Sequence, residues 1–172
     1  MSLYYESRAR YGSMPANIIG MKIDITPYIP QRIWSEFLRS GKLTVAIDPM
    51  QQELSRYANV LITRVQLELV GLHGEQPNRI QATLTHEGRA LIYDRSGNSH
   101  TFSHVPVSVP FEMEDGRLIV DGNVATGTND YEGLTPYGPW SINIDTTRMD
   151  HGFLARMKGI QLVFDGKARG RP

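Results

Sequence analysis

The stretch "TPYGPWSINID", residues 135–145, changes character part-way along. Its first half contains two prolines, a glycine and Tyr137, a composition that favours a rigid loop. Its second half alternates polar and apolar residues, so that Trp140, Ile142 and Ile144 share one face. This parity predicts a half-buried strand with Trp140 in the core. Tyr137, in the entry loop, is expected to be exposed and its loss to leave the fold intact.

The same alternation recurs along the chain. In "VQLELV" the apolar residues fall on one face, and so they do in "IQLVF" and "GMKIDITP". Gly, Asn, Asp or Pro closes most of these runs. "PQRIWSEFLRSG" instead has a helical period. These patterns predict a mostly β fold, an antiparallel two-sheet β-sandwich of the jelly-roll type, with one short helix near residues 30–40.

Domain organisation is simple at the sequence level. Residues 1–17 show no strand alternation and are interpreted as an N-terminal arm or connector, and residues 18–170 as a single β-sandwich domain. "HVPVSVPFEM" carries two prolines in a strand-like run. Because proline cannot donate to a ladder, this segment is expected to be an edge strand or to be bulged.

Composition excludes several classes of function. The 172 residues include no cysteine, which removes disulfides, thiolate metal sites and cysteine catalysis. Lys plus Arg and Asp plus Glu are both 18, and this neutral balance argues against a nucleic-acid partner. No apolar run is long enough to span a membrane. The sequence fixes no compartment; it is typical of a soluble protein, secreted or released within a larger complex without a signal peptide of its own.

Chemistry-bearing residues form no catalytic constellation, so we expect no catalytic residue, no metal and no cofactor. His86 and Asp94 lie in "THEGRALIYDRSG", which is interpreted as one hairpin with turns at "EGR" and "DRSG" whose polar side chains face water. A hydrolase built on these two residues is the weakest hypothesis. His100 and His104 are four residues apart on an expected strand, too far apart to share a metal. The loop aspartates 115, 121, 130, 145 and 150 raise the question of calcium, but turn-capping is the simpler interpretation.

A family resemblance follows from the order of five segments. These are "LITRVQLELVG", "IQATLTHEG", "YDRSGNSHTFSHVPVSVPFEM", "TPYGPWSINID" and "MKGIQLVFDGKARG", spanning about residues 55–170. Their pattern is similar to the C-terminal β-sandwich region of A subunits of tripartite insecticidal Tc toxins and related toxin-like proteins. The resemblance implies a non-enzymatic sandwich in a platform on which other subunits assemble. It transfers no site residue.

Two functional hypotheses remain in front. The first is a binding or assembly module that docks a protein partner or self-associates, within a larger toxin-like assembly. The alternative is a carbohydrate-binding module that holds a glycan with loop aromatics. The residues expected to contribute to binding are Tyr131, Tyr137 and His104.

Overall fold

The strands of the protein run antiparallel throughout, as seen in a computed structural model that describes residues 16–48, 54–72, 79–114, 117–120, 134–150 and 152–170. The elements are β1 (Ala16–Asp24), α2 (Gln31–Ser40), β2 (Lys42–Ile47), β3 (Tyr57–Val70), β4 (Arg79–His86), β5 (Arg89–Tyr93), β6 (Ser99–Ser103), β7 (Val107–Glu114), β8 (Arg117–Val120), β9 (Gly138–Ile144) and β10 (Gly159–Gly170). Two short 3-10 turns, Thr26–Tyr28 and Leu154–Arg156, complete the set.

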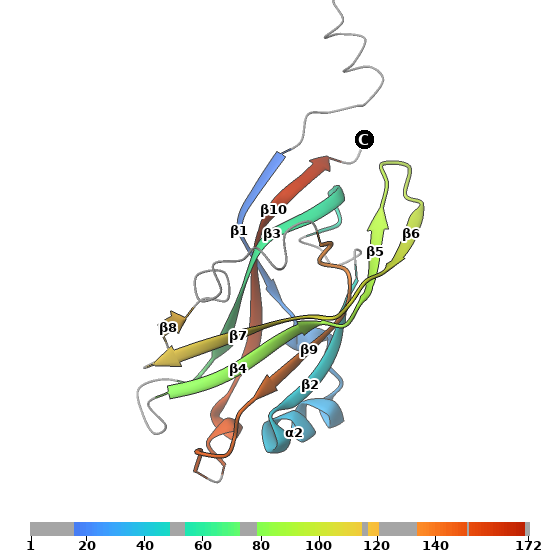
Figure 1. The fold of residues 1–172 in the computed structure, drawn as a ribbon. Helices are drawn as coiled ribbons and strands as arrows, with labels where there is room; N and C mark the ends of the chain where they lie inside the picture. Colours follow the sequence, from blue (N-terminus) through green and yellow to red (C-terminus); the bar gives the residue numbers. More distant parts are fainter. Residues whose placement is uncertain are drawn as a thin grey trace, which may run out of the picture.

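Two sheets form the body of the molecule (Figure 1). The three-stranded sheet has the order β1-β10-β3, and the five-stranded sheet has the order β2-β9-β4-β7-β8. The chain passes from one sheet to the other at β1, β2, β3 and β4 in turn, and again from β9 to β10. An isolated bridge between Ile62 and Leu134 brings the segment before β9 beside β3. This crossing pattern is that of a jelly roll, which confirms the predicted fold class.

The core lies between the two sheets. Apolar side chains of alternate residues are buried on every long strand, including Val65, Leu67 and Leu69 of β3. Trp140 on β9 approaches Phe164 on β10, with ring centroids 6.1 Å apart, and so links the five-stranded sheet to the three-stranded one. The predicted burial of Trp140, Ile142 and Ile144 is confirmed.

The predicted helix is α2, which lies at one end of the sandwich beside β2 (Figure 1). It follows Pro30 and ends before Gly41, whose N–H donates to Phe37 O at 2.8 Å. Phe37 is its fully buried residue.

Two sequence expectations need adjustment. β1 begins at Ala16, two residues inside the predicted arm, and residues 1–15 lie outside the described residues. β7 pairs with β4 along its length, but with β8 only over Glu112–Glu114, where the register shifts. β7 is therefore not the last strand of its sheet. Pro110 nevertheless has a strand partner on one side only among the described residues, which agrees with the proline argument.

Candidate functional site

A long bent hairpin leaves the five-stranded sheet, and its outer part, β5 and β6, turns toward the end of β3 (Figure 1). β4 and β5 form one arm of it and β6 and β7 the other, with β4 paired to β7 and β5 paired to β6. At the bend the ladder continues, because His104 N–H donates to Gly88 O at 2.8 Å. The predicted turn at "DRSG" is confirmed, whereas "EGR" is a bend within one arm and does not close a hairpin.

Gly88 makes this bend possible. Its φ of 92° is a backbone conformation that side chains disfavour, and a Cβ there would collide with the carbonyl oxygen of His104. The two arms can therefore approach closely at the bend only with glycine at this position.

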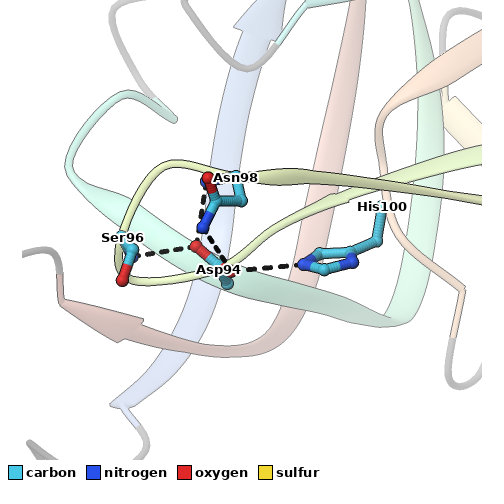
Figure 2. A network of polar contacts seen from close by, with 4 residues as sticks. All are labelled: Asp94, Ser96, Asn98 and His100. Carbon is cyan, nitrogen blue, oxygen red and sulfur yellow. Dashed lines mark hydrogen bonds and ion pairs between the residues drawn. The ribbon is translucent and has the colours of Figure 1, made fainter.

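The tip of the hairpin is organised by one carboxylate, as Figure 2 shows. Asp94 Oδ1 accepts hydrogen bonds from the N–H groups of Ser96 and Asn98, both at 2.9 Å. Asp94 Oδ2 lies 3.2 Å from His100 Nε2. The hydrogen bonds from His100 and then from Asn98 lower the pKa of Asp94 below its ordinary value. The carboxylate of Asp94 thus bonds within its own turn, a role that the sequence analysis did not assign to it.

On the outer side of the hairpin, β6 has no strand partner in the described part of the chain. All five of its residues are exposed. His104 N–H donates to Gly88 O, and Asp94 N–H donates to Asn98 O, so even-numbered residues bond across to β5. The N–H and C=O groups of Ser99, Thr101 and Ser103 then point away from β5. Beside this edge, Phe102 is 51% exposed and Val105 is 81% exposed.

A pair of histidines lies beneath the bend. His86, at the end of β4, is 0% exposed, and its Nδ1 lies 3.1 Å from Nε2 of the half-buried His104. His104 Nδ1 lies 2.7 Å from Val105 O. The His86 ring also meets Trp140 edge-on, with centroids 4.8 Å apart. His86 Nε2 has no partner within hydrogen-bonding geometry among the described residues. The nearby backbone groups of Tyr137 and Thr135 nevertheless act to raise the pKa of His86.

Burial, and then the neighbouring His104, lower the pKa of His86 from 6.5 to about 4. The cause is physical: a charged imidazolium in the core loses its hydration, and a second histidine at this distance repels it when both are charged. The Tyr137 and Thr135 backbone groups and Glu87 act in the opposite direction but do not outweigh burial. His86 is therefore neutral in the folded protein at neutral pH.

The segment Thr135–Gly138 packs against β5 of the hairpin. Thr135 Oγ1 donates to Leu91 O at 2.7 Å and accepts from Tyr137 N–H at 3.2 Å. The rings of Tyr137 and Tyr93 meet edge-on with centroids 5.8 Å apart. Tyr137 is 0% exposed, so the prediction of an exposed tyrosine in this loop is wrong. The loop lies between the hairpin and the core. β5 covers the Tyr137 side chain, whose position the alternation of strand residues does not determine.

The other predicted site residues have different outcomes. Tyr131 lies outside the described residues. Both ring nitrogens of His104 are engaged within the chain, so its predicted part in ligand binding stays a prediction that this geometry does not favour. His86 and Asp94 are not brought together: the carboxylate bonds to His100, and His86 faces His104. The pairing of His86 with His104 was missed by sequence reasoning.

Loop carboxylates form no metal site in the described part of the chain, where no group of three or more His, Asp or Glu side chains could hold an ion. Asp145 caps its own turn instead, accepting from the Thr147 N–H at 3.0 Å and its hydroxyl at 2.7 Å. Asp115, Asp121 and Asp130 fall outside the described residues.

One depression of about 520 Å³ lies on the outer face of the five-stranded sheet. Its lining residues are Gln81, Ala82, Thr83, Pro110, Phe111, Glu112, Asn143 and Asp145. No tyrosine or tryptophan of the described residues lines it, so it differs from the aromatic glycan platform that the sequence suggested. Glycan binding stays a prediction.

No protein-family model matches the chain, and no curated protein matches it. Among solved structures the chain is similar to the cryo-EM structure of Yersinia pseudotuberculosis TcaA-TcaB, with 11% sequence identity and a TM-score of 0.45. The match covers 96% of this chain and 10% of that chain. Among the described helices, none has the length and apolar character needed to cross a membrane.

Proposed function

We propose that the chain is a non-enzymatic assembly module that associates with a second copy of itself through the outer edge of β6. The observation that carries this proposal is the outer edge of β6, which has no strand partner among the described residues and lies on the hairpin that leaves the five-stranded sheet (Figure 1). An unpaired strand edge presents rows of free N–H and C=O groups, which pair readily with a strand of another chain.

β6 lacks the features that commonly keep strand edges apart. Its sequence, "SHTFS", contains no lysine, no carboxylate and no proline. β1, an edge strand of the other sheet, has such features: its register shifts between Ile18 and Met21, and Lys22 and Asp24 follow. The contrast favours β6 as the edge that pairs.

The β6 edge is also complementary to itself. In an antiparallel pairing centred on Thr101, threonine faces threonine and serine faces serine, pairs that form favourable cross-strand hydrogen bonds. Phe102 adds apolar area beside the new pair of strands, since half of its side chain is exposed. The formal net charge of zero creates no long-range repulsion between two copies.

Thr101→Pro tests the proposal, because it removes an outward-pointing N–H without removing a bond to β5. Size-exclusion chromatography with light scattering, over a wide range of concentrations at neutral pH, should show a dimer for the wild type and a monomer for Thr101→Pro. Thr101→Val is the matched control: it keeps the N–H and should remain dimeric. A wild type that is monomeric at every concentration contradicts self-assembly, and a dimer that survives Thr101→Pro contradicts the use of β6.

A further inference from the structure

The His86–His104 pair connects the sandwich to the bent hairpin. His86 ends β4 in the five-stranded sheet, whereas His104 follows β6 and begins the return to β7. Their ring centroids are 4.8 Å apart with planes inclined by 45°. This contact therefore joins the two arms of the hairpin at its bend, beside the buried ring of Trp140.

Hydrogen-bond chemistry fixes which protons this pair can hold. Val105 O can only accept, so His104 Nδ1 carries a proton and donates it. When His104 is neutral, its Nε2 is an acceptor, and His86 Nδ1 must supply the proton between the two rings. If His104 gains a proton, His86 Nδ1 becomes the acceptor and the proton of His86 moves to Nε2. Either arrangement satisfies the 3.1 Å contact.

This geometry cannot accommodate a proton on all four ring nitrogens of the pair. With both rings fully protonated, two N–H donors and two positive charges would face each other at 3.1 Å, with His86 excluded from water. The charged groups that act on His86 from the described residues are His104, across the bend, and Glu87, next in its own chain. The Thr135–Gly138 segment presents backbone groups to the His86 ring, and β9 presents the ring of Trp140. Neither element supplies a carboxylate that could neutralise a charged His86.

We propose that the His86–His104 pair is a proton-operated latch, which holds the β5–β6 hairpin to the sandwich at neutral pH and releases it when acid protonates both rings. Release exposes Leu91, Tyr93 and the Thr135–Gly138 segment that β5 covers. As a means of regulating assembly, the latch rests on the proposed function of β6. The opening itself does not, because it occurs within one chain.

Hydrogen exchange of the wild-type chain tests the latch. Opening lets His86 return to its ordinary pKa of 6.5 from about 4, so the open population should rise as pH falls between these values. After correction for intrinsic exchange rates, protection of the β5–β6 amides should fall about tenfold from pH 7.5 to 5.5, and about 70-fold to pH 4.5. Amides of β3 and β10, which exchange on global unfolding, should remain better protected than those of β5–β6 at every pH. Equal protection of β5–β6 at pH 7.5 and 4.5 overturns the proposal.

Two variants locate the effect. His86→Leu removes the titrating ring and should make β5–β6 protection independent of pH in this range. His100→Gln is the matched control, because it removes a histidine of the same hairpin that contacts Asp94 at the tip (Figure 2). It should retain the full pH response, and a lost response in His100→Gln would overturn the assignment to His86. If His86→Leu does not fold, the wild-type profile and His100→Gln still decide. Exchange needs no second copy, so failure of the latch is distinguishable from failure of β6 pairing.

Discussion

At the scale of single residues, Trp140 connects the core to the candidate site. Its indole N–H donates to Pro136 O at 2.8 Å, its ring contacts His86 on one side, and it approaches Phe164 of the other sheet. A buried aromatic with this many roles fixes the entry loop, the histidine and the sheet packing at once. Tyr137 shares that burial, since its ring lies against Tyr93 of the hairpin.

Trp140→Ala is therefore expected to lower the free energy of unfolding by about 3–5 kcal/mol, the usual cost of truncating a buried aromatic. Urea denaturation followed by circular dichroism measures it. Trp34→Ala is the control, because Trp34 is only half-buried on α2, and it should cost clearly less. Equal costs for the two variants would show that Trp140 does not fix the core.

Tyr137→Ala should also destabilise the fold, contrary to what its loop sequence suggests.

At the scale of elements, the bent hairpin depends on close contact of its two backbones. Gly88 faces the His104 carbonyl, and Gly138 has a φ of 117° with Arg89 O so close that a Cβ would collide with it. β5 is thereby held between its own hairpin partner and the start of β9.

Gly88→Ala should destabilise the protein by more than Gly97→Ala, as measured by the midpoint of urea unfolding. Both glycines have positive φ, but a Cβ at Gly97 meets nothing within 4 Å, whereas one at Gly88 meets the His104 carbonyl. Gly97→Ala should thus cost about 1 kcal/mol for backbone strain alone, and Gly88→Ala about 2 kcal/mol or more. Similar losses for both variants would mean that the bend relaxes without cost.

At the scale of the whole molecule, His86 links stability to pH. Its folded pKa of about 4 lies below the ordinary 6.5, so the unfolded chain binds the proton more readily. Stability is then full above pH 6.5 and falls as pH decreases toward 4. Asp94 and Asp145 have a pKa lowered from 3.8, so their contribution is lost only at more acidic pH.

The free energy of unfolding should accordingly be about 3 kcal/mol lower at pH 4 than at pH 7.5. Urea titrations at several pH values between these limits measure the change. His86→Leu should flatten the curve over this range, whereas His100→Gln should leave its shape unchanged. A wild type equally stable at pH 7.5 and pH 4 would show that His86 is not held neutral by the fold.

Sequence alone determined the apolar core face of strands such as β3, β9 and β10, where α2 begins and ends, and that a turn lies at "DRSG". These features follow from local periodicity and from turn chemistry within a few residues. Counting back from the "DRSG" turn, the hairpin register would also have placed His104 opposite Gly88 and so near His86. That signal was present in the chain but needs the turn to be fixed first.

Only the tertiary structure decided the burial of Tyr137 and the contact of His86 with both His104 and Trp140. Each depends on segments distant in sequence: β5 covers the Tyr137 loop, and β9 places Trp140 against the end of β4. Periodicity records which face of a strand is apolar, but it does not record what lies above a loop. The cover over residues 135–138 is decided by the sheet order and by the bend that places β5 of the hairpin over them. Burial there comes from packing between elements and not from the residue pattern of any one element.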